Sequence, residues 1–92
     1  MSGDDAYWSV TFSSRAEREL GRLDPPIRSR VIEAIKGLRF EPPIGDIKRL
    51  VGVTPPEWRL RVGGWRVRFR QNPATRTIEI GRVQPRGRAY RD

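Results

Sequence analysis

The sequence contains no cysteine and no histidine. Without cysteine the chain can form no disulfide, offers no thiol nucleophile and provides no zinc–thiolate site. Without histidine it lacks the side chain that most often acts as a general base near neutral pH. Any catalysis therefore has to use Arg, Lys, Tyr, Asp or Glu, and we expect no metal ion and no cofactor.

Long hydrophobic runs are also missing. No apolar stretch approaches the roughly 18 residues that a membrane-spanning helix needs, and residues 1–6 are acidic and polar, unlike a signal peptide. We therefore expect a cytoplasmic protein without membrane association. The length of 92 residues suits one small domain, predicted to span 1–92.

Basic residues are present in excess, and they are unevenly distributed. The net charge is +8, and 17 of the 19 basic residues are arginine. Residues 1–45 hold seven basic and seven acidic side chains, whereas residues 46–92 hold twelve basic and four acidic ones. An imbalance confined to one half of the chain indicates a polyanionic partner, with nucleic acid as the first candidate.

The first half reads as a strand followed by two helices. Residues 7–12 alternate as a half-buried strand does. A capping box at residues 14–17 predicts the start of one helix. Asp24 as N-cap and Pro25 as first helical residue predict a second helix, which Pro42 and Pro43 follow.

The second half reads as strands. A short strand is expected over 46–50, a hairpin over 58–69 with a glycine turn at 63–64, and a last strand around Ile78 and Ile80. The alternation slips after Gly81, which indicates a bulge or a strand end, and residues 82–92 are expected to be irregular. These patterns predict an α+β fold: an N-terminal strand and an αα-hairpin packed on a small, mainly antiparallel twisted β-sheet.

The turn fixes the register of the hairpin. With residues 63 and 64 in the loop, all three apolar pairs fall on one face, which agrees with the pattern. The opposite face then sets Arg61 across from Arg66, Arg59 across from Arg68, and Glu57 across from Arg70. Like charges directly across a ladder are unfavourable.

Two interpretations fit these arginines. They can be long side chains that splay apart on a solvated face, or a surface kept cationic to bind phosphates in a bidentate manner. The number of arginines on one small face favours phosphate binding. We expect Arg66 to be exposed, so that Arg66→Ala leaves the fold intact.

The end of the chain adds Arg82, Arg86, Arg88, Tyr90 and Arg91. An aromatic ring among arginines suits RNA, because bases stack on the ring while guanidinium groups bind the backbone. Taken alone, a tyrosine near a terminus more often packs against the sheet.

Residues 58–67, which read Trp-Arg-Leu-Arg-Val-Gly-Gly-Trp-Arg-Val, resemble the central hairpin of RelE/ParE-type toxins. Residues 80–91 resemble the closing strand and basic segment of that family, and the order of elements matches as well. RelE-like members are ribosome-dependent endoribonucleases that cut mRNA, and each is neutralised by a co-expressed antitoxin. The resemblance thus implies a type II toxin with an antitoxin, the ribosome and mRNA as partners, and a hetero-oligomeric toxin–antitoxin complex.

By this resemblance Arg66 and Arg86 match the two catalytic arginines, and Tyr90 matches the tyrosine that stacks on the substrate base. The group that transfers the proton is left open among Tyr90, Glu57, Glu79 and Lys48, because Pro85 stands where many relatives carry histidine. Further RNA contacts are expected from basic side chains: Arg59, Arg61, Arg68, Lys48 and Arg88.

Three alternatives stay open at this stage. A ParE-type toxin has the same fold but inhibits DNA gyrase without cutting RNA. A non-catalytic basic module would bind many RNAs in a salt-dependent way. The basic face could also dock an acidic or amphipathic antitoxin segment, which is compatible with toxicity.

Overall fold

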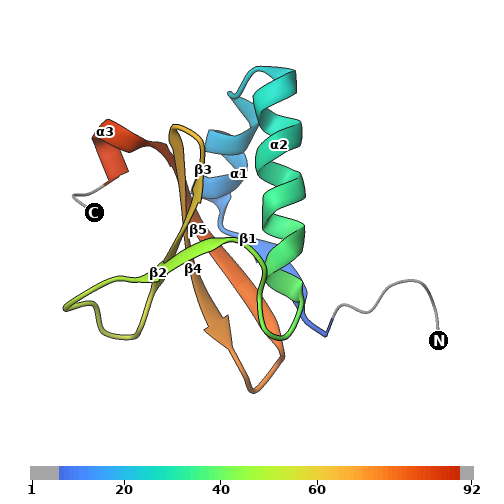
Figure 1. Ribbon diagram of the computed structural model, residues 1–92, viewed down its shortest axis with the longest axis vertical. Coiled ribbons are helices and arrows are strands. Elements are labelled where there is room, and N and C mark those ends of the chain that lie inside the picture. Colours follow the sequence, from blue (N-terminus) through green and yellow to red (C-terminus); the bar gives the residue numbers. More distant parts are fainter. Residues whose placement is uncertain (1–6, 90–92) are drawn as a thin grey trace.

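The computed structural model describes residues 7–89, with the backbone alone for residues 88 and 89. Two helices and a short 3-10 turn follow the first strand, and four further strands precede a last helical turn (Figure 1). In chain order the elements are β1 (Ser9–Phe12), α1 (Ser14–Gly21), α2 (Pro25–Lys36), η1 (Gly37–Arg39), β2 (Asp46–Arg49), β3 (Trp58–Val62), β4 (Trp65–Asn72), β5 (Thr77–Pro85) and α3 (Arg86–Ala89).

The strands form one five-stranded sheet in the order β1-β5-β4-β3-β2. Three of its four strand pairings are antiparallel, and the fourth joins β1 to β5 in parallel. Figure 1 shows α1 and α2 together on one side of the sheet, with α2 running alongside the strands. The expected α+β architecture is confirmed.

The central hairpin has the register that its glycine turn predicted. Val62 pairs with Trp65, and Arg61 pairs with Arg66. Gly63 has a φ of +56°, a conformation that glycine adopts without steric cost. Each arginine of β3 therefore lies directly across from an arginine of β4.

The core fills the space between the two helices and the inner face of the sheet. Side chains at alternate positions of three strands point inward, and one side of each helix covers them. The buried apolar residues are Ala16, Leu23, Val31, Ile35, Leu38, Leu60, Val67, Phe69, Ile78, Ile80 and Val83. Because these positions take the inner face, the arginines between them are directed to the outer face of the sheet.

Helix α1 begins with a cap that differs from the predicted one. The N-cap is Ser13, one residue earlier than the capping box at 14–17 requires, and its Oγ accepts a hydrogen bond from the Ala16 N–H at 3.0 Å. The same hydroxyl donates to the carbonyl oxygen of Gly81 at 3.0 Å. The cap therefore also anchors α1 to β5. In α2, Asp24 precedes Pro25 as predicted, but its side chain makes no capping hydrogen bond.

The irregular end predicted for residues 82–92 is wrong for the described part. A register shift between Arg68 and Phe69 of β4 leaves Gly81 without a cross-strand partner, which is the predicted bulge. The pairing of β5 with β4 continues beyond the bulge residue Gly81. Arg82 pairs with Arg68, and Val83 is again buried in the core. Strand β5 consequently continues to Pro85, and α3 follows it.

Within residues 7–89, no helix has both the length and the apolar character needed to cross a membrane.

Candidate nucleic-acid interface

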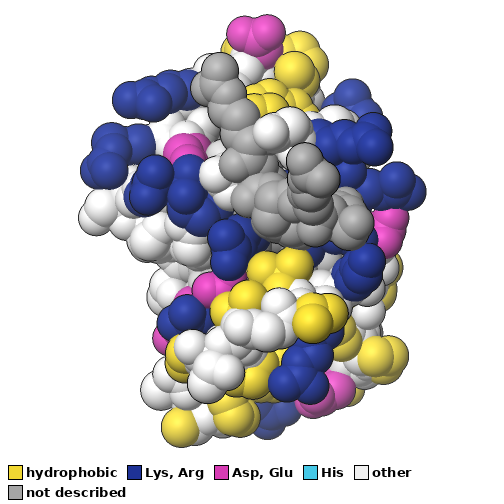
Figure 2. All heavy atoms as spheres, turned by 90° about the vertical axis from the view of Figure 1, so that its left-hand side faces the viewer, with side chains coloured by type: hydrophobic (Ala, Val, Ile, Leu, Met, Phe, Trp, Pro, Cys, Tyr) yellow, Lys and Arg dark blue, Asp and Glu magenta, His cyan; other side chains and the backbone are white. Residues whose placement is uncertain are grey.

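Four basic residues form one continuous row across the outer face of the sheet. Register pairs Lys48 with Arg59, Arg59 with Arg68, and Arg68 with Arg82, so the row crosses β2, β3, β4 and β5. Directly paired residues project from the same face, and strands lie about 4.8 Å apart, so the row is about 14 Å long. We call these four residues the cationic row. Figure 2, which views the molecule from the side opposite α2, shows many Lys and Arg side chains with a few carboxylates among them.

Asp46 of β2 bridges two arginines of β3. Its Oδ2 accepts a hydrogen bond from Nε of Arg61 at 2.6 Å, and its Oδ1 lies 3.3 Å from Nη1 of Arg59. The hydrogen bond from Arg61 lowers the pKa of Asp46, the little burial there opposes this, and the positive charges of Arg61 and Arg59 lower it further. Arg59 is 6% exposed, so Asp46 offsets the charge of a largely buried cation.

Glu57 holds the next pair of arginines. Its Oε1 lies 2.7 Å from Nη2 of Arg68, and its Oε2 lies 3.0 Å from Nη2 of Arg70. The predicted juxtaposition of Glu57 and Arg70 is confirmed as a direct contact. With one carboxylate oxygen for each arginine, both guanidinium groups are held in fixed positions.

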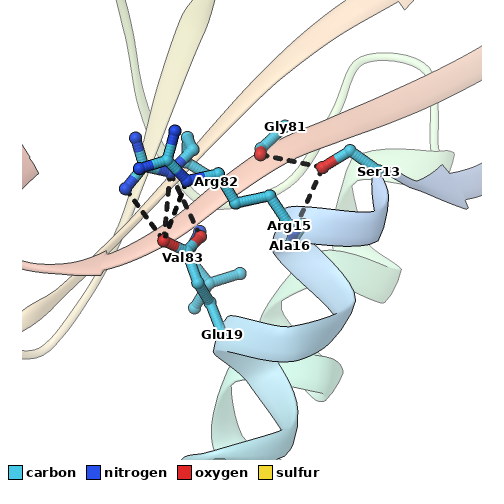
Figure 3. A network of polar contacts seen from close by, with 7 residues as sticks. All are labelled: Ser13, Arg15, Ala16, Glu19, Gly81, Arg82 and Val83. Carbon is cyan, nitrogen blue, oxygen red and sulfur yellow. Dashed lines mark hydrogen bonds and ion pairs between the residues drawn. The ribbon is translucent and has the colours of Figure 1, made fainter.

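Arg82, the last member of the cationic row, is held by Glu19 of α1 (Figure 3). Its Nε and Nη2 donate to Oε2 of Glu19 at 3.0 and 2.9 Å. Oε1 of the same carboxylate accepts the backbone N–H of Val83 at 2.8 Å. Burial raises the pKa of Glu19, but the hydrogen bonds from Arg82 and Val83, with the charges of Arg82 and Arg15, bring it below its ordinary value.

Arg66 is buried, contrary to the expectation of an exposed side chain. It is 3% exposed, and its Nη1 donates to the carbonyl oxygens of Gly63 and Trp65, each at 3.0 Å. The side chain folds back over the hairpin turn because those two carbonyls are acceptors within reach of its guanidinium. The expected exposure of Arg66 is therefore wrong, and so is the reason for expecting Arg66→Ala to leave the fold intact.

The same turn brings Arg86 near Arg66. The backbone N–H of Arg86 donates to the carbonyl oxygen of Gly64 at 2.9 Å, which fixes the start of α3 beside the hairpin. The Arg86 side chain is exposed. Two of the three predicted catalytic residues thus gather at one end of the sheet, while Tyr90 lies outside the described residues. The Arg88 side chain likewise lies outside the described part of the structure.

Two carboxylates of this candidate interface, Asp46 and Glu19, are what sequence reasoning missed. The hairpin turn sets the register of β3 against β4, but nothing in the sequence sets the register of β2 or places Glu19 beside β5. Asp46 and Glu19 therefore could not be assigned to particular arginines. Of the predicted RNA-binding residues, Arg59, Arg61 and Arg68 each contact a carboxylate, whereas within residues 7–87 Lys48 is an exposed cation with no ion pair.

Comparison with known proteins identifies the family of the chain. A family model described as ParE toxin of type II toxin-antitoxin system, parDE, matches residues 10–90. Among solved structures, the chain is similar to one in the RelE–RelB complex of Pyrococcus horikoshii, at 28% identity and a TM-score of 0.75, over 90% of this chain and 99% of that one. It is also similar to a chain in the RelBE2 toxin–antitoxin complex of Mycobacterium tuberculosis, at 29% identity and a TM-score of 0.73, over 86% and 98%.

A third similarity is to a chain in the RelB–RelE complex of Methanococcus jannaschii, at 25% identity and a TM-score of 0.68, over 83% of this chain and 89% of that one. No protein of curated function matches the chain significantly by sequence. The family model spans nearly the whole chain, and these structural matches cover 83% to 90% of it. The chain therefore belongs to the RelE/ParE superfamily of toxins of type II toxin–antitoxin systems.

Proposed function

We propose that this toxin is a ribosome-dependent endoribonuclease that cuts mRNA and so inhibits translation in the cytoplasm. The observation that carries the proposal is the cationic row next to the hairpin turn, to which the Arg66 side chain and the Arg86 backbone are both hydrogen-bonded. Lys48, Arg68 and Arg82 present exposed or partly exposed basic groups to phosphates, and the buried Arg59 adds positive charge to the row. An array of this kind suits a single-stranded RNA that lies across the strands.

The proposed reaction needs no metal or cofactor. The 2′-oxygen of one nucleotide attacks the adjacent phosphorus, loses its proton to a base, and the 5′-oxygen leaves with a proton from an acid. Arg86 stabilises the charge that develops on the phosphate, and Arg66 adds positive charge from its buried position at the hairpin turn. Tyr90 stacks on a base, and the cationic row aligns the strand. Among the groups considered for proton transfer, Glu57 is the least suited because arginines already occupy both of its oxygens.

The antitoxin is the second partner that we propose. Three similar structures are complexes of a RelE protein with a RelB protein, and we infer a cognate antitoxin and a hetero-oligomeric complex for this chain. A bound antitoxin segment with acidic side chains would also compete with RNA for the cationic row.

The test is controlled expression in bacteria with mapping of mRNA 5′ ends during translation. Arg86→Ala is the most informative variant, because this exposed side chain can be removed with little loss of packing. Arg18→Ala is the matched control: Arg18 is an exposed arginine on α1, away from the sheet's outer face. We expect cuts in phase with codons for the wild type and Arg18→Ala, and their loss in Arg86→Ala. Unphased cuts, or cuts unaffected by Arg86→Ala, would contradict the proposal.

A ParE-type activity is the second candidate, and the family model that matches residues 10–90 favours it. In that case the toxin would inhibit DNA gyrase and leave mRNA intact. The same expression experiment separates the two activities. Growth arrest without new mRNA ends, together with loss of supercoiling by purified gyrase when the toxin is added, would assign the protein to this second activity.

A further inference from the structure

A cavity of about 510 Å³ opens at the end of the cationic row, over the strands β1, β5 and β4. Its lining includes Thr11 of β1, Glu79 and Gly81 of β5, and Arg68 and Arg70 of β4, with Glu57 beside them. Arg68 and Arg82 belong both to the row and to the cavity wall. A strand of RNA lying along the row would thus pass the mouth of this cavity.

The bulge at Gly81 leaves room for the cavity. Gly81 has no cross-strand partner, and a Cβ added there would meet only the Arg68 carbonyl oxygen, at 3.8 Å. Its φ lies outside the left-handed region. Neither the backbone conformation nor a steric clash requires glycine at position 81. A larger side chain there would therefore mainly reduce the volume of the cavity.

The charge balance of the cavity differs from that of the row. Glu57 is shared by Arg68 and Arg70, and Arg82 is engaged by Glu19, so two carboxylates offset most of the charge of three guanidinium groups. Glu79 adds an exposed carboxylate, and within residues 7–87 its one hydrogen bond is that from Asn72 Nδ2 to Oε2 at 3.3 Å. A phosphate would be repelled by Glu79. A neutral, planar group with hydrogen-bond donors would not.

The two clamped guanidinium groups offer a stacking surface. Arg68 is 26% exposed and Arg70 is 43% exposed, and each is fixed by its own oxygen of Glu57. Guanidinium planes stack on nucleobases, and fixing them beforehand reduces the entropy lost on binding. Glu79 and Thr11, which pair in the β1–β5 register, supply a carboxylate and a hydroxyl at the edge of the cavity.

We infer that this cavity is a subsite for one nucleobase of the bound RNA, and that it selects bases that carry an exocyclic amino group. This inference rests on the proposed RNA-cleaving function and names a specificity element of the same site. The base stacks on the guanidinium groups of Arg68 and Arg70, and its amino group donates to Glu79. Guanine, adenine and cytosine have such a donor and uracil does not, so uracil is the least favoured base.

The test measures binding alone, so that it does not depend on cleavage. The probes are seven-nucleotide RNAs with 2′-O-methyl groups, which remove the attacking hydroxyl, made of uridine except for one varied central base. For the full wild-type chain we expect an affinity about 5-fold or more higher with guanine, adenine or cytosine at the centre than with uracil. Gly81→Leu should place a bulky side chain in the cavity beside Arg68 and abolish this preference while retaining the affinity for the all-uridine RNA.

Gly21→Leu is the matched control, because Gly21 ends α1 and an added Cβ there meets nothing within 4 Å. It should keep the preference. Should Gly81→Leu fail to fold, as judged by its melting curve, Glu79→Ala removes the accepting oxygens at an exposed position and should also lose the preference. Equal affinity of the wild type for all four RNAs, or a preference that survives both Gly81→Leu and Glu79→Ala, would overturn the inference.

The outcome for the base subsite is separable from that for the proposed function. If base-selective binding is lost in Gly81→Leu but the wild type makes no codon-phased cuts in cells, the inferred base subsite stands and the proposed ribonuclease activity is refuted. If the wild type makes codon-phased cuts but binds all four RNAs equally, the proposed ribonuclease activity stands and the base subsite is refuted.

Discussion

The Glu19 carboxylate joins helix α1 to the strand β5 by accepting hydrogen bonds from both the Arg82 side chain and the Val83 backbone. Strand β1 pairs with β5 as far as Ile80, so among the described residues no strand lies beside the edge of β5 beyond that point. Glu19 satisfies one N–H of this open edge and neutralises one cation of the row. A single side chain thereby performs a structural and an electrostatic role.

Glu19→Gln should lower the stability of the fold. The substitution keeps the shape but replaces charge-assisted hydrogen bonds by neutral ones, at a cost of about 1–3 kcal/mol. Because the folded pKa of Glu19 is lowered, its contribution is present above the unfolded pKa of about 4.3 and is lost as pH falls through the folded value. As the pH is lowered below about 5, the melting temperature of the wild type should therefore fall more steeply than that of Glu19→Gln. Glu17→Gln, at an exposed position of α1, is the control, and equal pH profiles for wild type and Glu19→Gln would disprove the linkage.

Ser13→Ala should cost about 1 kcal/mol, because it removes the N-cap of α1. It also removes the hydrogen bond to the Gly81 carbonyl oxygen. Ser14→Ala should have almost no effect, since Ser14 is already inside the helix. Urea unfolding of both variants measures the difference, and a larger loss for Ser14→Ala would instead support the capping box that the sequence suggested.

Arg66→Ala should destabilise the protein by about 1–3 kcal/mol, because it leaves two carbonyl oxygens of the hairpin without their donor. For a domain of this size the melting temperature would fall by roughly 5 °C or more. Arg66→Lys keeps the charge and should fold, but it loses the planar guanidinium, so we expect RNA cleavage to drop at least about 100-fold. Melting curves and mRNA end mapping test the two variants. An Arg66→Ala protein as stable as the wild type would show that burial of this arginine contributes nothing to the fold.

Asp46→Asn should increase the affinity for single-stranded RNA. It frees Arg61 and Arg59 from their carboxylate, so the salt dependence of binding should become steeper by up to about one unit of logarithmic slope. Glu33→Gln adds the same net charge on α2, where Glu33 pairs with Lys36, and should change binding much less. Anisotropy titrations at several salt concentrations distinguish these variants, and equal gains for both would mean that net charge alone controls the affinity.

The parts of the fold that depend on local patterns were predictable from the sequence. Alternation and the glycine turn determined the hairpin and its register, because a slip by one residue would expose the apolar face. Gly81 was recognised as a break in alternation for a similar reason. The cap of α1 was assigned one residue late, since Ser13 and Ser14 are chemically equivalent and the choice depends on the Gly81 carbonyl, 68 residues away in the chain.

The candidate site was predictable in its cations but not in their partners. A repeated Arg on alternate positions of paired strands reveals a cationic face, whereas its neutralisation by Asp46 and Glu19 depends on tertiary contacts that no spacing encodes. The burial of Arg66 was unpredictable for a related reason. Its position on the outer face suggested exposure, but its side chain turns back onto the carbonyls of its own turn.

The parallel pairing of β1 with β5 bears on how the toxin is made. Residues 9–12 pair with residues 77–80, so the first strand has its neighbour in the sheet only after nearly the whole chain has been synthesised. Contacts of such wide sequence separation slow folding, because a long loop must close before they form. A nascent or prematurely terminated chain that ends before β5 would lack both the strand that covers the core and Arg82 of the cationic row. Completion of the polypeptide through β5 is thus a precondition for a folded toxin.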